Sequence, residues 1–338
     1  MNISKRVKAF PPYKSKSVGN NIRMDKNESP YPLPKEIKKE VLTELDKVQF
    51  NRYPQIAARS LRESLADYLG VGPENVVVGS GSDEMIPLVL NTLSARRAII
   101  TPPTFSMYRF YAELNQMSLV KVPLNDSFRL SVEKIKEEID DKTIVFICSP
   151  NNPTGNVFPR DQIVDLLDTD VPLILDEAYW EFSGSTNIDL VESYQNLVVL
   201  RTFSKAYGIA GVRVGYAVSN AAMIDYMLRI KSPYNLNSLS MITAEVMLRQ
   251  HDLVEDRVRR IIKERQRIFG RLGDHCYPSE ANFLLLDLDA GEYLADRGIA
   301  VRTFESELTD KVRVTIGRRE QNDEFLKYIQ GYIADENS

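Results

Sequence analysis

The chain has 338 residues, of which 43% are hydrophobic and 27% charged, a composition typical of globular proteins rather than of disordered or collagen-like chains. This length predicts two domains or one elaborate α/β domain. The 43 Lys and Arg residues against 47 Asp and Glu residues give a net charge of -4. No overall positive field therefore attracts nucleic acid or an anionic membrane, and we expect neither as a partner.

The sequence contains no recognisable targeting segment and few residues that commonly bind metals. No apolar run approaches the roughly 18 residues that a membrane span needs, and the first 20 residues lack the apolar block of a secretory signal. The sequence therefore predicts a cytoplasmic protein. Two cysteines, Cys148 and Cys276, and two histidines, His251 and His275, are too few for a disulfide framework or a histidine-rich metal centre, so we expect no metal site.

Short apolar runs alternate with amphipathic helical stretches from about residue 55 to residue 220. The runs are rich in β-branched residues on consecutive positions, and they cover 76–79, 97–102, 143–150, 171–180, 196–205 and 212–218. Strands that are buried on both faces have this pattern. It predicts an α/β fold with a mostly parallel sheet covered by helices.

The pattern changes after residue 235. A charged helical stretch from Ser238 to about Leu272 precedes apolar runs at 281–288, 298–304 and 311–317 and a final helix, which predicts a smaller α+β domain. The first residues contain Pro30, Pro32 and Pro34, which favour extended backbone. We therefore expect an N-terminal segment (1–35) that packs on the small domain and the pocket, a large domain (36–237) and a small domain (238–338).

The first candidate site lies where the run 76–79 enters a Gly-Ser-Gly-Ser turn and a helix that is predicted to begin at Asp83. Small residues expose backbone N–H groups there, and a helix N-terminus adds partial positive charge, so the turn suits a phosphate group. The spacing fits neither a dinucleotide fingerprint nor a P-loop. The alternative is a tight turn capped by Ser82 or Asp83.

Two further candidates follow apolar strands. The Asn- and Pro-rich loop 149–158, which contains Asn152, follows one strand, and the carboxyl ends of parallel strands are where α/β proteins bind ligands. Asp176 ends the next strand, with Tyr179 close behind it. A carboxylate there is costly unless it meets a cation. The alternatives are a plain turn and a helix cap.

The fourth candidate is Lys205, which follows a strand and the hydroxyl residues Thr202 and Ser204, with Arg213 beyond a Gly-containing turn. A partly desolvated lysine at a strand end has a lowered pKa and attacks carbonyl groups. Hydroxyls and an arginine suit a phosphate. The alternative is an ordinary solvated lysine.

All four candidates fall at the carboxyl ends of predicted parallel strands, in one layer of one sheet. Together they supply a phosphate cradle, an amide, a carboxylate and an amine. Pyridoxal 5'-phosphate needs this combination of groups.

The motifs S-P-N-N-P-T-G, D-E-A-Y, T-F-S-K and G-V-R-V-G-Y make the chain resemble the fold-type I, pyridoxal-phosphate-dependent aminotransferases over nearly its full length. Within that superfamily it is most similar to the histidinol-phosphate aminotransferases, through K-N-E-S-P-Y, N-R-Y-P, G-S-G-S-D-E and V-R-V-T-I-G. The resemblance implies a large domain with a mostly parallel seven-stranded sheet between helices, plus a smaller α+β domain. It implies small-molecule substrates, with amino transfer between histidinol phosphate and 2-oxoglutarate.

The resemblance also implies residue roles. Lys205 would bind the cofactor covalently and move a proton, Asp176 would pair with the pyridinium nitrogen, Asn152 and Tyr179 would bond the phenolic oxygen, and Tyr108 would stack on the ring. The residues implied around the cofactor phosphate are Ser82, Asp83, Thr202, Ser204 and Arg213. Tyr53 would reach that phosphate from a second subunit, which implies a homodimer with shared active sites.

Three residues are implied in substrate binding. Arg313 would hold a carboxylate or phosphate, Arg302 would make a second anion contact, and Asn27 would lie in the N-terminal segment over the pocket. The alternative for each arginine is a surface position on a strand. Ser29 replaces the second Asn of the family's N-E-N-P motif, which leaves the contacts of this segment open.

Other activities use almost the same motifs, namely threonine-phosphate decarboxylation and aromatic amino-acid transamination. A hypothesis of another class is a non-catalytic, pyridoxal-phosphate-binding regulator. The intact set of Lys205, Asp176, Asn152 and Arg213 argues against a catalytically dead relative. The loop P-Y-N-L-N at 233–237 receives no catalytic task, and the role of Asn235 stays open.

Overall fold

The computed structural model describes residues 3, 5–8, 10–12, 22–305 and 307–336. Residues 13–21 of the expected N-terminal segment, with the remaining positions, lie outside the described residues. Within the described part, no helix is long and apolar enough to cross a membrane.

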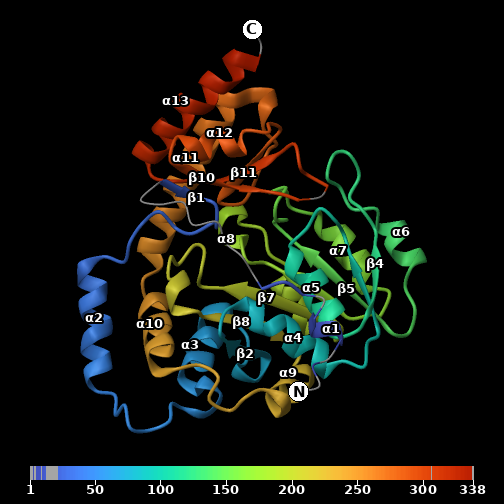
Figure 1. Ribbon diagram of the computed structural model, residues 1–338. Coiled ribbons are helices and arrows are strands. Elements are labelled where there is room, and N and C mark those ends of the chain that lie inside the picture. The colour runs from blue at the N-terminus through green and yellow to red at the C-terminus, as the bar shows by residue number, and fades with distance from the viewer. Residues whose placement is uncertain (1–2, 4, 9, 13–21, 306, 337–338) are drawn as a thin grey trace.

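The larger sheet has seven strands among the described residues (Figure 1). Their order is β2 (Val76–Gly79), β8 (Gly215–Ser219), β7 (Leu197–Thr202), β6 (Leu173–Asp176), β5 (Thr143–Cys148), β3 (Arg97–Ile100) and β4 (Ser118–Lys121). β8 is antiparallel to β2 and to β7, while the other neighbours are parallel. The predicted α/β fold with a mostly parallel seven-stranded sheet is confirmed.

Helices bury both faces of this sheet. Alternate residues such as Val77 and Phe146 belong to one hydrophobic cluster with α4 (Ser82–Thr92), α5 (Ser106–Leu114) and α9 (Ala221–Ile230). Their neighbours Val76 and Val145 belong to a second cluster on the opposite side. This double burial explains why the strands are apolar at consecutive positions.

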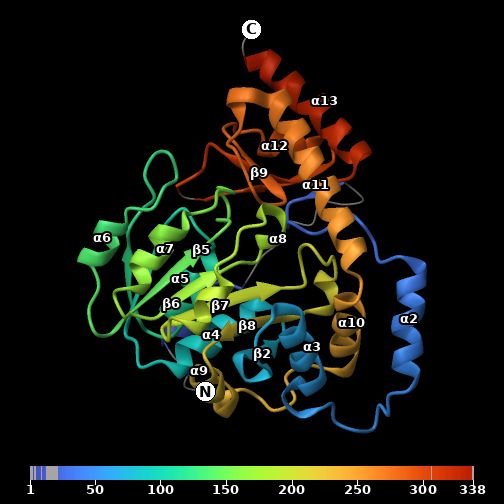
Figure 2. The same ribbon diagram turned by 180° about the vertical axis from the view of Figure 1, so that it is seen from behind.

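The second cluster is covered by other helices. These are α2 (Lys35–Asp46), α3 (Arg59–Leu69), α6 (Val132–Glu137), α7 (Arg160–Leu167), α8 (Trp180–Ser183) and α10 (Ser238–Leu248). Figure 2 shows α2 beside α10 at the flank of the molecule. The described residues also include a short helix, α1 (Lys5–Lys8), and five 3-10 helices: Ile56–Ala58, Pro73–Asn75, Ile188–Glu192, Ala210–Val212 and Gly273–His275.

A smaller, four-stranded sheet lies above the main sheet in Figure 1. Its order is β1 (Ile22–Met24), β10 (Ile299–Thr303), β11 (Val312–Thr315) and β9 (Phe283–Leu286), accompanied by α11 (His251–Leu272), α12 (Gly291–Asp296) and α13 (Arg319–Glu336). β1 is parallel to β10, and the other pairs are antiparallel. The chain from residue 22 therefore starts in the C-terminal sheet before it enters the large one.

Two details differ from the sequence-based expectation. The helical stretch from Ser238 to Leu272 is two helices, because Gln250 leaves helical geometry with φ -100 and ψ 45 before α11. α4 begins at Ser82 with Gly81 as its N-cap, and no side chain caps it. The predicted start at Asp83 and the capping alternative are therefore wrong, and the N–H groups of Ser82 and Asp83 keep their donor capacity.

Candidate active site

The topology brings the predicted site residues to one edge of the main sheet. β2, β5, β6 and β7 run in the same direction, so the loops after Gly79, Cys148, Asp176 and Thr202 leave the sheet at the same edge. β8 runs the opposite way and begins at this edge, where Gly215 pairs with both Gly79 and Thr202. Arg213, just before β8, therefore joins the other residues.

Asp176 is a buried carboxylate at the end of β6. Tyr108 Oη donates a hydrogen bond of 2.6 Å to its Oδ2, and the Ala178 N–H donates one of 3.0 Å to its Oδ1. Burial raises the pKa of Asp176 to about 6, although both hydrogen bonds oppose the rise. No ion pair to Asp176 is formed within the described part of the chain. A cationic ligand atom there would recover the electrostatic cost of burying this carboxylate.

Lys205 follows β7, and its Nζ donates a hydrogen bond of 3.0 Å to the Lys26 carbonyl. The Nζ lies 5.7 Å from the centre of the Tyr179 ring. Burial, followed by the positive charge of Arg313, lowers the pKa of Lys205 to about 8. A substantial fraction of this amine is therefore neutral and nucleophilic at mildly alkaline pH.

The expected phosphate ligands gather at the start of α4. Arg213 Nη2 lies 3.2 Å from Asp83 Oδ2, and Thr202 Oγ1 donates a hydrogen bond of 3.0 Å to Ser204 Oγ. The backbone approaches closely here: a Cβ on Gly215 would lie 2.1 Å from the Ser82 nitrogen. Gly81 has φ +79, and a Cβ there would meet Arg213 Nη2 at 2.4 Å. Glycine at both positions keeps a cradle of N–H groups and a guanidinium open, which fits a phosphate.

A polar network joins the N-terminal segment to both sheets. The Tyr179 hydroxyl accepts hydrogen bonds from Asn27 Nδ2 at 3.0 Å and from Asn152 Nδ2 at 3.3 Å. Arg313 Nη1 donates to Asn152 Oδ1 at 2.5 Å, and its Nη2 donates to the Asp25 carbonyl at 2.7 Å. Arg313 is buried. The structure thus places Asn27, Asn152, Tyr179 and Arg313 together, beside Lys205.

Tyr108 lies in the protein core beneath this network. It is fully buried, and its ring stacks on Phe146 with centroids 5.0 Å apart and planes at 13°. Its hydroxyl reaches Asp176. Its stacking on a cofactor ring stays a prediction.

Two predicted residues lie away from the cluster. Arg302 is exposed on β10, although its backbone pairs with Arg313, so both side chains are on the same face of the small sheet. Tyr53 has 80% of its surface exposed and stacks on Tyr234, with centroids 4.6 Å apart. Neither touches the Lys205 surroundings in any contact described above.

Sequence reasoning missed a buried ion pair behind the site. Arg201 Nη2 lies 2.7 Å from Glu177 Oε2, with side chains 2% and 1% exposed, and the Arg201 guanidinium lies 4.1 Å from the centre of the Trp180 ring. Glu177 follows Asp176, and Arg201 belongs to the strand that precedes Lys205. Opposite charges at the carboxyl ends of two neighbouring apolar runs, one of them just past the end of β6, are the sequence signal for such a pair.

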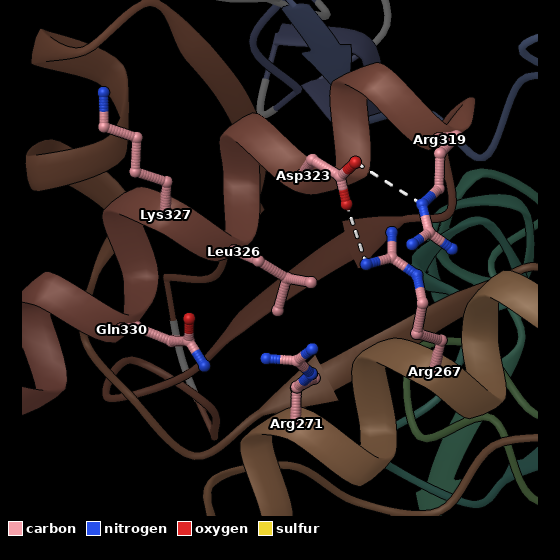
Figure 3. Close-up of a pocket in the computed structure, with 7 residues that line it drawn as sticks. All are labelled: Arg267, Arg271, Arg319, Asp323, Leu326, Lys327 and Gln330. Carbon is pink, nitrogen blue, oxygen red and sulfur yellow. Dashed lines mark ion pairs between the residues drawn. The ribbon is translucent and has the colours of Figure 1, made fainter.

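A charged surface hollow of about 470 Å³ lies elsewhere, between α11 and α13 (Figure 3). Its lining includes Arg267, Arg271, Arg319, Asp323 and Lys327. Asp323 pairs with Arg267 at 2.8 Å and with Arg319 at 3.4 Å. These helices belong to the small-sheet unit, and none of the predicted site residues lines the hollow.

The fold and this site define an aminotransferase. The family model for aminotransferase class I and II matches residues 20–329, and the chain belongs to that family. It is 48% identical to the histidinol-phosphate aminotransferase of Thermococcus gammatolerans over 99% of this chain and 98% of that protein. It is 45% identical to the enzyme of the same name from Pyrococcus furiosus, over 98% of each chain. The predicted resemblance is confirmed.

A solved structure has the same fold. Histidinol-phosphate aminotransferase from Sinorhizobium meliloti, in complex with pyridoxal-5'-phosphate, superposes with a TM-score of 0.89 at 22% identity and covers 98% of each chain. At this level of identity the likeness concerns the fold. The edge of the sheet that holds Asp176 and Lys205 therefore belongs to a fold that accommodates this cofactor in another protein.

Proposed function

We propose that the protein is a pyridoxal-phosphate-dependent aminotransferase that interconverts histidinol phosphate and 2-oxoglutarate with imidazole-acetol phosphate and glutamate. The observation that carries the proposal is the convergence of a half-buried amine, a buried carboxylate and a buried arginine at one edge of the sheet: Lys205, Asp176 and Arg313. The name shared by relatives at 45% and 48% identity supports the choice of substrate.

The donor set fits the cofactor at both ends. The turn before α4 and Arg213 offer N–H donors and positive charge to a phosphate, and Gly81 and Gly215 leave the space. Asp176 offers a buried negative charge to a protonated ring nitrogen. Asn152 is hydrogen-bonded to both Tyr179 and Arg313, and Asn152 and Tyr179 would contact the phenolic oxygen of the cofactor. When bound, pyridoxal phosphate supplies a reactive aldehyde carbon and an electron-withdrawing ring.

Lys205 has two tasks in this proposal. As a neutral amine it would hold the cofactor covalently, and its lowered pKa, about 8, favours the neutral form. The same amine would act as the general base and acid that takes and returns the proton that moves during amino transfer. Asp176 holds the positive charge on the ring nitrogen, and the buried pair Arg201–Glu177 keeps the ends of β6 and β7 in place.

Arg313 binds the substrate anion. Its guanidinium is buried beside Asn152 and points at the surroundings of Lys205, whose pKa it lowers. A carboxylate or phosphate suits the fixed fork of its donors. Asn27 contributes from the N-terminal segment, and the exposed Arg302 on the same face provides a second anion contact.

The active form in this proposal is a homodimer in the cytoplasm. Each chain consists of an N-terminal segment (1–35), a large domain (36–237) and a small domain (238–338). Several large apolar side chains are exposed near Tyr53: Phe50 at 82%, Ile56 at 64% and Tyr234 at 39%. An exposed apolar patch of this kind marks a contact surface. Tyr53 would then reach the phosphate turn of the second copy. Cys148 and Cys276 are free thiols, as is usual for proteins of a reducing compartment.

The test is a substrate comparison on the purified protein with pyridoxal 5'-phosphate. We expect turnover of histidinol phosphate with 2-oxoglutarate, and little with threonine phosphate or phenylalanine. Lys205→Ala should abolish turnover and the borohydride-sensitive visible absorbance of the bound cofactor. Carbon dioxide release from threonine phosphate without turnover of histidinol phosphate would assign the decarboxylase activity instead. Cofactor binding without turnover of any substrate would favour the regulator.

A further inference from the structure

The loop 231–237 carries polar contacts that the proposed chemistry does not use. Asn237 caps α10, since its Oδ1 accepts a hydrogen bond of 2.8 Å from the Ser240 N–H. Asn235 instead points toward the start of α4. Its Nδ2 lies 3.1 Å from Glu84 Oε1, 3.0 Å from Glu84 Oε2 and 3.3 Å from the Val78 carbonyl.

Both ends of this contact are held. Lys231, which is buried, donates a hydrogen bond of 2.5 Å from Nζ to Asn235 Oδ1. Glu84 Oε2 accepts a hydrogen bond from the Ser80 N–H. The order is therefore ammonium, amide, carboxylate and backbone N–H, and each member has its natural donor or acceptor.

The last member belongs to the turn that would hold the cofactor phosphate. Glu84 packs closely on this turn, because a Cβ on Gly79 would lie 2.6 Å from its Oε2. The carboxylate binds the Ser80 N–H and so leaves the N–H groups of Ser82 and Asp83, at the start of α4, for a ligand. The position of Glu84 therefore sets the shape of the cradle.

The same loop contacts the segment that carries Tyr53. Tyr234, next to Asn235, stacks on Tyr53, and the Ala57 N–H donates a hydrogen bond of 3.2 Å to the Pro233 carbonyl. The exposed aromatic surface and the phosphate turn are thus connected through one short loop.

We infer that Asn235 is a positioning residue: with Lys231 it fixes Glu84, and through Glu84 it fixes the phosphate-binding turn 79–82 relative to the Tyr53 segment. This inference rests on the proposed function, because the ligand of the turn is the cofactor phosphate. It concerns binding of the phosphate end, whereas Lys205 and Asp176 serve the ring end. Substitution of Asn235 should therefore leave the binding affinity of a cofactor analogue without the phosphate unchanged.

The experiment compares pyridoxal 5'-phosphate with pyridoxal, which lacks the phosphate. Dissociation constants are measured by titration of the cofactor-free protein. In Asn235→Ala the affinity for pyridoxal 5'-phosphate should fall about tenfold, the size expected for loss of a hydrogen bond to a charged group, while the affinity for pyridoxal stays within about twofold. Asn237→Ala is the matched control, because it removes a helix cap from the same loop: its thermal midpoint should fall and its preference for the phosphate should not.

A charge exchange tests the pairing itself. Asn235→Asp places a second carboxylate against Glu84 and should lose the phosphate preference. Adding Glu84→Gln reverses donor and acceptor, so the double variant should recover most of it. If the double variant binds pyridoxal 5'-phosphate no better than Asn235→Asp, the pairing does not hold the turn.

The outcomes separate the two proposals. A wild-type protein without preference for pyridoxal 5'-phosphate over pyridoxal would contradict the proposed function. A wild-type protein with that preference, retained in full by Asn235→Ala, would overturn the positioning role alone.

Discussion

The hydroxyl of Tyr108 lies 2.6 Å from the carboxylate of Asp176, and this hydrogen bond is buried beneath the candidate active site. Each partner changes the titration of the other. Burial first, and then the charge of Asp176, raises the pKa of Tyr108. The neutral hydroxyl of Tyr108 thus holds the Asp176 carboxylate in place without cancelling its charge, which a cationic ligand atom can neutralise.

Asp176→Asn should stabilise the cofactor-free protein while it abolishes activity. The pKa of Asp176 is about 6 when folded against 3.8 ordinarily, so the folded state retains a proton that the unfolded state loses between about pH 4 and pH 6. Stability from Asp176 is therefore complete below pH 4 and is lost as the pH rises through 6. At pH 7.5 the asparagine variant should gain about 1–3 kcal/mol in the free energy of unfolding, since one pKa unit corresponds to about 1.4 kcal/mol.

Denaturant titrations of the cofactor-free protein at pH 7.5 and pH 4.5 check this expectation. The gain should shrink toward the lower pH. Asp189→Asn is the control, because Arg160 lowers the pKa of the exposed Asp189 and its neutralisation brings no gain at pH 7.5. Equal gains of Asp176→Asn at both pH values would contradict the argument.

The pair Arg201–Glu177 should contribute far more to stability than a surface pair of similar geometry. Glu177→Ala leaves Arg201 buried without a counter-charge, which costs about 3–5 kcal/mol. Asp189→Ala breaks the exposed pair with Arg160, where Nη2 and Oδ2 lie 2.6 Å apart, and should cost at most about 1 kcal/mol. Denaturant midpoints of the two variants give the comparison. Similar losses would show that burial does not decide the difference.

Arg313 should control the pH at which Lys205 reacts. Its charge is the second cause, after burial, of the lowered pKa of about 8. Arg313→Gln therefore raises the pKa of Lys205, and the rate of covalent cofactor attachment should reach half its maximum at a higher pH than in the wild type. Arg302→Gln is the matched control, because Arg302 pairs with Arg313 in the sheet but is exposed. A pH midpoint that moves equally in both variants would assign the effect to overall charge.

The sequence predicted the buried strands and the residues at their ends for a common physical reason. Strands such as β5 and β6 carry runs of consecutive apolar residues because both faces are covered, and a charge at the end of such a run is conspicuous. Asp176 and Lys205 were found in this way. β4 was missed because it is an edge strand with exposed Ser118 and Lys121 at its ends, so it lacks that pattern.

Contacts between distant segments were outside the reach of sequence patterns. Glu84 and Asn235 both lie in motifs that the sequence reveals, but their pairing depends on how the loop after α9 packs on the start of α4. The position of Tyr108 is similar: its hydroxyl reaches Asp176 from α5, although the motif indicates only that it lies near the site. Local sequence patterns thus indicate the reactive residues, whereas the contacts that hold these residues in place depend on tertiary packing.

Tyr53 provides the sharpest test of a shared active site. It is 80% exposed and carries no contact to its own phosphate turn among those described. If it serves the second copy, Lys205→Ala and Tyr53→Ala damage complementary halves of each site. A mixed dimer then contains one site with an intact lysine and an intact tyrosine. Unfolding and refolding an equal mixture of two inactive variants should restore roughly one quarter of wild-type activity, since half of the dimers are mixed and each has one complete site.

Activity after refolding each variant alone is the control for this experiment. The second control is an equal mixture of Lys205→Ala and Asp176→Ala, in which both changed residues belong to the site of one subunit. Because Asp176 and Lys205 lie in the same subunit's site, each mixed site lacks one of them, and no activity should return. Recovery with Tyr53→Ala but not with Asp176→Ala would demonstrate the contribution across the interface. Equal absence of recovery in both mixtures would show that Tyr53 does not complete the active site of the second copy.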